Sequence, residues 1–278
     1  MTGLNLSLGI IVANVLMYIA VQGNQSLLYR MIFISGAVRK QGEYSRLIAS
    51  GFVHAGPLHL LFNMLTLYFF GPYVEELYGP LTFMGIFLGS VVGGNLFCLL
   101  LFREDNSYSA LGASGGLFGV VYAFIWAMPE VRLSLMIIPV PIQGWLFGIL
   151  ITLISIALTQ AKRGHEANIS HEGHLGGAFW GGLIGAMVMM LVFNILGDVA
   201  VDKWEEGIAL EHSFVSILGP IGFSVKNHEL LLRWVGMRYN FDYSMSWVLL
   251  WAGILPVGIF WLLQEIRPSI FKRKWWRK

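Results

Sequence analysis

The sequence predicts an all-α membrane protein, a six-helix transmembrane bundle with an additional C-terminal helix. Of its 278 residues, 56% are hydrophobic and only 12% are charged, whereas soluble domains carry about 25% charged residues. Several uncharged runs also reach about 18 residues, the length that a helix needs to cross a hydrocarbon layer about 30 Å thick. Helices must do the spanning, because a backbone in lipid satisfies its hydrogen bonds within its own segment.

The uncharged runs, separated by charged residues, place the six helices along the chain. They are expected at Leu4 to Val21, Leu58 to Tyr73, Leu81 to Phe102, Ser114 to Met128, Gln143 to Gln160 and His171 to Leu196. The connection from Gln22 to Val53 mixes basic residues with the apolar stretch MIFISGAV, so we expect it to fold at the membrane interface.

The chain therefore divides into three segments. Residues 1–197 are expected to form the six-helix core, 198–245 a polar connecting segment with an interfacial amphipathic helix, and 246–278 a seventh helix with a basic tail. The tail FKRKWWRK combines cations with tryptophans, which suits anionic headgroups, so membrane lipids are expected partners. The net charge is only +2 and no basic face is visible, so nucleic acid is not an expected partner.

Glycines recur at four-residue spacing in three of the expected helices. The three sets are Gly85, Gly89 and Gly93; Gly115 and Gly119; and Gly177, Gly181 and Gly185. Such faces let helix backbones approach each other closely, so the bundle is expected to be tight.

Polar side chains in three of these apolar stretches point to a site. His54, His59 and Asn63 lie in HAGPLHLLFNM, Ser114 in ALGASGGLFGVV, and His174 in HEGHLGGAFWGGLIG. Taken singly, a serine can bond to its own helix, a histidine can lie at the interface, and an asparagine can join two helices. Together, however, they are the components of an acyl-transfer site, and polar groups inside a membrane usually serve a function.

Acyl transfer needs a nucleophile, a base and donors for the developing oxyanion. Ser114 supplies the hydroxyl at the expected start of a helix, where free N–H groups and the helix dipole favour negative charge. His174 is the candidate base, and His59 and Asn63, one helical turn apart, are candidate donors. Glu172 lies two residues before His174 and so on another helix face, and the sequence therefore predicts a Ser-His dyad.

These motifs resemble the rhomboid family of intramembrane serine proteases. The resemblance rests on GASG at Gly112 to Gly115, on HAGPLHLLFNM, on HLGGAFWG from His174, and on GPYVEELYG at Gly71 to Gly79, in the family's order and spacing from Arg46 to Gly185. It implies a multi-pass serine endopeptidase that cleaves peptide bonds in or next to transmembrane helices of membrane-protein substrates. It further implies a rhomboid-like catalytic core, no cofactor or metal, and the plasma (inner) membrane if the source is bacterial.

The resemblance also implies a role for individual residues. Ser114 becomes the nucleophile and His174 the general base, while His59, Asn63 and the Ser114 N–H form the oxyanion hole. The remaining positions support the site: Gly112 and Gly115 open the backbone, His54 braces the site, Phe118 stacks on the imidazole, and Glu75 makes structural hydrogen bonds. The family's Trp-Arg pair appears here as Ser45 and Arg46, and His171 stands where some members carry Asn.

Three other functions compete with a protease. A catalytically silent rhomboid-like binder of membrane proteins typically lacks the Ser or the His, and both are present here. An intramembrane metallohydrolase would have to gather His54, His59, His171 and His174, but the HExxH pattern of zinc proteases fails because position 175 is Leu. A transporter fits polar residues inside the membrane, but inverted repeats are not apparent.

Overall fold

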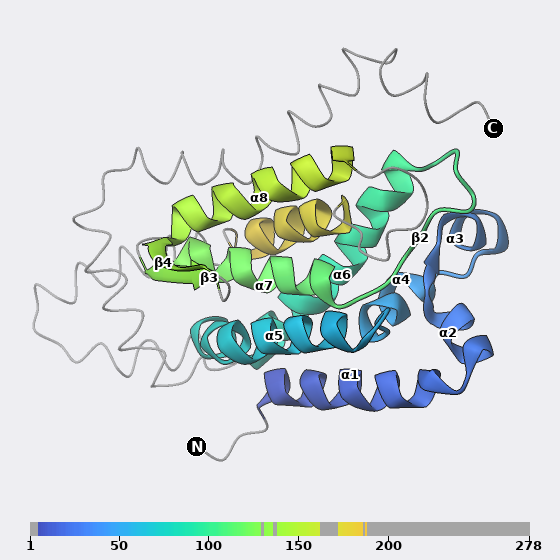
Figure 1. Ribbon diagram of the computed structural model, residues 1–278, viewed down its shortest axis with the longest axis horizontal. Helices are drawn as coiled ribbons and strands as arrows, with labels where there is room; N and C mark the ends of the chain where they lie inside the picture. Colours follow the sequence, from blue (N-terminus) through green and yellow to red (C-terminus); the bar gives the residue numbers. More distant parts are fainter. Residues whose placement is uncertain (1–4, 129–130, 136–137, 162–171, 186, 188–278) are drawn as a thin grey trace, which may run out of the picture.

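The computed structural model describes residues 5–128, 131–135, 138–161, 172–185 and 187 (Figure 1). Its elements are α1 (Leu6–Gln22), α2 (Gln25–Met31), β1 (Phe33–Ile34), α3 (Ser35–Gln41), α4 (Arg46–Ala49), the 3-10 helix η1 (Ser50–Phe52), α5 (Pro57–Tyr78), α6 (Pro80–Leu101), β2 (Ser109–Ala110), α7 (Ser114–Ala127), β3 (Arg132–Leu135), β4 (Ile138–Gln143) and α8 (Gly144–Ala161). Residues 172–185 form a further helix, drawn in yellow in Figure 1. His171, the segment 198–245 and the expected seventh helix in 246–278 lie outside the described residues.

Apart from the end of α5, the long helices follow the predicted ranges closely. The start of α1 is defined by side-chain hydrogen bonds to its first N–H groups. The side chain of Asn5 accepts a hydrogen bond from the Leu8 N–H, and the carboxylate of Glu75 accepts from the N–H groups of Leu6 and Ser7 at 2.9 and 3.0 Å. These N–H groups have no partner inside the helix, and a negative charge at this end also matches the helix dipole. Glu75 thus makes the structural hydrogen bonds expected of it, and they join α5 to α1.

The predicted end of α5 at Tyr73 is wrong, because the helix continues through Pro72 to Tyr78. The prediction took the charged pair after Tyr73 as the end of the apolar run. Instead, the Glu75 carboxylate accepts hydrogen bonds from the start of α1, and Tyr78 is buried with its hydroxyl donating to the Ala123 carbonyl at 2.8 Å. Tertiary partners therefore keep the last turn helical.

Helix α7 lies in the middle of the described bundle, packed against α5, α6 and α8 (Figure 1). Eleven of its 14 residues are buried. At about 1.5 Å per residue its length is about 21 Å, shorter than a hydrocarbon layer of about 30 Å. If one end of α7 lies near a membrane surface, its other end therefore lies inside the hydrocarbon layer.

The predicted glycine faces form the contact between α7 and the helix at 172–185. A Cβ built on Gly177 would lie 2.0 Å from the Gly115 carbonyl oxygen, and one on Gly181 would lie 2.1 Å from the Gly119 Cα. Only hydrogen in place of a side chain permits this approach. The two glycine faces thus bring the backbones of these helices into direct contact.

The connection between α1 and α5 is folded, as predicted, and Arg46 holds it together. Arg46 is only 4% exposed, and its guanidinium donates to the carbonyls of Ile32 and Tyr29 and pairs with the Glu43 carboxylate. The guanidinium also lies 5.4 Å from the centre of the Tyr29 ring. Arg46 therefore seats the connection even though Ser45 stands beside it in place of the family's Trp.

A short antiparallel pair that the sequence did not predict joins this connection to the chain before α7. Phe33 of β1 is paired with Ala110 of β2, and Ile34 with Ser109. Two-residue strands carry no readable hydrophobic period, so only the tertiary structure reveals them. The pair fixes the chain four residues before Ser114.

One of the described helices, α6, is long and apolar enough to cross a membrane alone, and α5 meets the same test only together with α4 and η1, across a 95° bend. The outer faces of α1 and α5 carry large exposed apolar side chains: Leu8, Leu16, Ile19, Leu58, Tyr68 and Tyr73. Apolar exposure spread over two helices is typical of a surface that faces lipid or a partner rather than water.

Replacing Gly177 by alanine is expected to destabilise the protein, because the new methyl group would meet the Gly115 carbonyl. Overpacking of this kind costs about 1–3 kcal/mol, measurable as a lower thermal midpoint of the purified protein in detergent. Gly85→Ala is the control, since nothing lies within 4 Å of a Cβ built there. Alanine favours a helix over glycine by about 0.5–1 kcal/mol, so equal midpoints for the two variants would contradict the close packing.

Candidate active site

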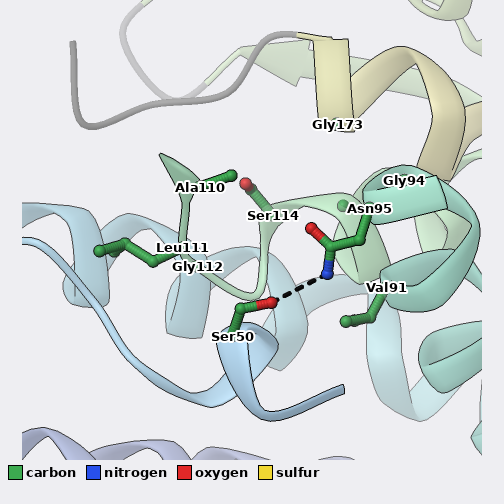
Figure 2. Close-up of a pocket in the computed structure, with 10 residues that line it drawn as sticks. Ser50, Val91, Gly94, Asn95, Ala110, Leu111, Gly112, Ser114 and Gly173 are labelled. Carbon is green, nitrogen blue, oxygen red and sulfur yellow. Dashed lines mark hydrogen bonds between the residues drawn. The ribbon is translucent and has the colours of Figure 1, made fainter. Parts of the chain in front are cut away.

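Ser114 is the first residue of α7, and the turn before it depends on Gly112. Gly112 has a φ of 119°, a backbone conformation that residues with a side chain rarely adopt. The Gly112 N–H donates to the Ser50 carbonyl at 2.8 Å. This turn presents the Ser114 side chain to a pocket (Figure 2) and leaves the first N–H groups of α7 without partners inside the helix.

His174, 60 residues later in the chain, meets Ser114 from the helix at 172–185. Its Nε2 lies 2.8 Å from the Ser114 Oγ, a hydrogen-bond distance, and its side chain is only 7% exposed. The ring of Phe118, one turn along α7 from Ser114, stacks on the imidazole with the ring centres 4.4 Å apart and the planes 13° apart. Close packing at Gly115, where a Cβ would lie 3.4 Å from the Gly173 carbonyl oxygen, accompanies this contact. The structure thus brings the predicted nucleophile and base together.

His59 and Asn63 of α5 lie against the same turn from the other side. A Cβ on Gly112 would lie 2.9 Å from the His59 Nε2 and 3.7 Å from the Asn63 Nδ2. Both nitrogens are buried and have no hydrogen-bond partner among the described residues. Because a buried polar group without a partner costs free energy, these nitrogens are well suited to bind an oxygen of a ligand at this turn.

His54 lies in the connection between η1 and α5 and contacts the backbone of the turn at Gly112. It is buried, its ring meets that of His59 edge to face at 5.1 Å, and its Nε2 accepts a long hydrogen bond of 3.5 Å from the Ala113 N–H. Burial, and to a smaller extent the neighbouring His59, together lower the pKa of His54 to about 3. A neutral imidazole at this position can accept from the backbone beside Ser114.

Glu172 is directed toward Tyr108 of the chain before β2. Its carboxylate is buried and accepts a 3.4 Å hydrogen bond from the Tyr108 hydroxyl. Tyr108 also contacts the Cys98 sulfur at 3.5 Å and stacks on Phe102. Sequence reasoning did not pick out Tyr108, because a single tyrosine in a polar loop carries no pattern.

The pocket beside Ser114 contains two further polar residues that sequence reasoning missed, Ser50 and Asn95 (Figure 2). The whole lining is Ser50, Val91, Gly94, Asn95, Ala110, Leu111, Gly112, Ser114, Gly115 and Gly173. Asn95 could have been found by the rule that selected Asn63, since it too is an amide within an apolar helix. No sequence signal would have found Ser50, a serine in the connection between two predicted helices.

The described residues contain no group of three or more His, Cys, Asp or Glu that could hold a metal ion. His54 and His59 lie together, while His174 is engaged with Ser114 and Phe118. The histidine set that a metallohydrolase would need also includes His171, which is outside these residues.

Comparison with known proteins matches residues 41–191 to the rhomboid domain. RHOMBOID-like protein 12, mitochondrial, of Arabidopsis thaliana is 29% identical over 187 residues, covering 62% of this chain and 54% of the relative. Rhomboid protease GluP of Bacillus subtilis is 32% identical over 142 residues, covering 51% and 25%. Inactive RHOMBOID-like protein 8 of Arabidopsis thaliana is 32% identical over 101 residues, covering 35% and 29%. The matches thus span about half the length of these relatives or less.

Proposed function

Because this chain belongs to the rhomboid family of integral membrane proteins, we propose that it is an intramembrane serine endopeptidase with a Ser-His dyad. The observation that carries the proposal is the 2.8 Å contact between the His174 Nε2 and the Ser114 Oγ at the start of a buried helix. A relative that is itself named a protease, GluP, supports the same class of activity.

In the proposed reaction, His174 acts first as a base and then as an acid. With its proton on Nδ1, the imidazole takes the Ser114 proton at Nε2 while Oγ attacks the carbonyl carbon of the scissile peptide bond. Collapse of the tetrahedral intermediate breaks the C–N bond, and His174 gives the proton to the leaving amine. Water, deprotonated by the same imidazole, then releases the acyl group from Ser114.

The negative oxygen of the intermediate is assigned to the turn at Gly112. The Ser114 N–H, the His59 Nε2–H and the Asn63 Nδ2–H are proposed to donate to it, and the positive end of the α7 dipole points to the same place. His54 supports these donors through Ala113. Donors that are already in position need no reorganisation when the charge develops.

The proposed architecture is a multi-pass core over residues 1–197 with six spanning helices, followed by the segments 198–245 and 246–278. Because α7 is short, Ser114 is proposed to lie below the membrane surface, and water must reach it through a polar cavity. Suitable substrates are transmembrane helices that unwind easily, since a helix in lipid hides its carbonyls. Contact with anionic lipids through FKRKWWRK, and a plasma (inner) membrane location if the source is bacterial, belong to the same proposal.

A membrane-protein binder without catalytic activity is the second candidate, because one similar protein is named an inactive RHOMBOID-like protein. Such a binder would recognise transmembrane helices without cutting them. The Ser114–His174 contact favours the protease, since a binder has no use for a hydroxyl aligned with an imidazole.

The test is to purify the full chain in detergent and treat it with a fluorophosphonate probe and, separately, with a model transmembrane substrate. The proposal expects a covalent probe adduct that maps to Ser114 and cleavage of the substrate within or beside its helix. A protein that binds the substrate but gives neither adduct nor cleavage is a binder. Cleavage that chelators abolish, without a serine adduct, would point to a metalloenzyme.

Replacing Asn63 by alanine is expected to lower kcat by about a hundredfold to a thousandfold, the range for loss of one oxyanion donor. The loss should be at the low end if His59 compensates. Thr66→Ala on the same helix is the control, because among the described residues the Thr66 hydroxyl donates to the Phe62 carbonyl of its own helix. If steady-state cleavage by Asn63→Ala matches that of the control, Asn63 does not belong to the oxyanion hole.

A further inference from the structure

We propose that Asn95 is a positioning residue for the Ser114 turn, acting through Ser50 on the backbone of Gly112. The inference rests on the proposed function, since Asn95 can position a reaction only if Ser114 reacts. Asn95 is not assigned contact with the scissile bond.

Both hydrogens of the Asn95 amide nitrogen are engaged in hydrogen bonds. Its side chain is 8% exposed on α6, within an apolar and glycine-rich stretch. The Nδ2 group donates to the Leu47 carbonyl and to the Ser50 Oγ, both at 2.8 Å, and Figure 2 shows the second bond. Both hydrogens of the amide nitrogen are thus used to hold α4 and η1, more than 40 residues earlier in the chain, against α6.

The same face of α6 also contacts η1 through apolar packing. Val91 lies one helical turn before Asn95, and a Cβ built on Gly51 would lie 2.7 Å from the Val91 Cγ1. The backbone of η1 therefore rests directly on α6 beside the Asn95 amide. The packing contact of Val91 is not directional, whereas hydrogen bonds are. The two hydrogen bonds of Asn95 therefore fix the orientation of α4 and η1.

The 3-10 helix η1, oriented in this way, holds Gly112 in place. The Ser50 carbonyl accepts the Gly112 N–H at 2.8 Å, and Gly112 lies two residues before Ser114 and against His59. A continuous path of hydrogen bonds and peptide units therefore runs from Asn95 through Ser50 to the donors of the proposed oxyanion hole. Misplacement of a reacting group by about 1 Å can cost a hundredfold in rate, so a small shift of Ser50 is sufficient to slow the reaction.

The experiment compares Asn95→Ala, Ser50→Ala and the double variant with the wild-type chain. The measurements are the rate constant for labelling of Ser114 by a fluorophosphonate probe, kcat and KM for a model transmembrane substrate, and the thermal midpoint. We expect Asn95→Ala to lower the labelling rate and kcat about tenfold, with KM changed less than about twofold. Ser50→Ala should lower kcat about threefold, and the double variant should match Asn95→Ala alone, because residues in one network are not additive.

Asn14→Ala is the matched control for loss of a buried amide. Asn14 is fully buried in α1, and its Nδ2 donates to the Ile10 carbonyl of its own helix at 2.8 Å. Its replacement should lower the thermal midpoint as Asn95→Ala does and leave kcat within about twofold of wild type. Loss of a positioning residue and loss of a structural residue should therefore both lower the thermal midpoint, but only loss of the positioning residue should lower kcat.

Two results, each obtained with an active wild-type chain, would overturn this inference but leave the proposed function intact. The first is a kcat of Asn95→Ala that is no lower than that of Asn14→Ala. The second is a double variant in which the losses of the two single variants multiply. If Asn95→Ala does not fold, Ser50→Ala decides, and an unchanged kcat rejects the positioning path. A wild-type chain that gives neither labelling nor cleavage overturns the proposed function, and the inference with it.

Discussion

Replacement of Ser114 by alanine is expected to abolish cleavage of a transmembrane substrate, with a loss in kcat of at least about a thousandfold. The variant retains His174 and the oxyanion donors but has no atom to form the acyl bond. Folding should be unaffected, because Ser114 contributes one partly buried hydroxyl and makes no cap to its helix. The measurements are cleavage in detergent or proteoliposomes, probe labelling and the thermal midpoint.

Ser109→Ala is the control for this experiment. Ser109 lies five residues earlier, in β2, and its side chain is exposed. It should behave as wild type in all three assays. Equal cleavage by the wild type and Ser114→Ala would contradict a mechanism with Ser114 as the nucleophile, whatever the result of labelling.

Replacement of His174 by alanine is expected to reduce cleavage and probe labelling to a similar degree. Without the imidazole, no other group in the part of the chain that the structure describes lies within hydrogen-bond distance of the Ser114 Oγ to take its proton. The protein should also lose the stacking contact of Phe118, worth about 0.5–1.5 kcal/mol for a pair of aromatic rings. A modest fall in the thermal midpoint therefore accompanies a large fall in rate.

His228→Ala, at a histidine outside the matched rhomboid domain of residues 41–191, is the matched histidine control and should leave both rates unchanged. A His174→Ala variant that labels within a few-fold of wild type would show that the imidazole only packs beside the serine. The two alanine variants therefore distinguish a dyad from a structural pair.

Much of the candidate site could be predicted from the sequence, because membrane burial makes polar residues conspicuous. Ser114, His174, His59 and Asn63 stood out as polar groups in apolar segments, and the structure brings all four to one turn. Phe118 and Glu75 came only from the resemblance to a family, since an aromatic or a carboxylate beside a helix has many ordinary uses. Their contacts with His174 and with the start of α1 are properties of the tertiary structure.

Helix boundaries were less predictable where a distant residue decides them. The charged pair after Tyr73 appeared to end α5, yet Glu75 is held by the N–H groups of Leu6 and Ser7, almost 70 residues earlier in the chain. The β1–β2 pair and the Asn95–Ser50 link were likewise beyond sequence reasoning, because each depends on two segments that have no shared local pattern.

By itself, the sequence determined the class of the protein, the ranges of most helices, the close glycine faces and the set of candidate reactive groups. These depend on composition and local periodicity, which are properties of neighbouring residues. The 2.8 Å contact of Ser114 with His174, the orientation of His59 and Asn63 toward Gly112, and the path from Asn95 through Ser50 were decided only by the tertiary structure. The physical reason is that distances of this order depend on how whole helices pack, and the glycine faces allow close packing without specifying it.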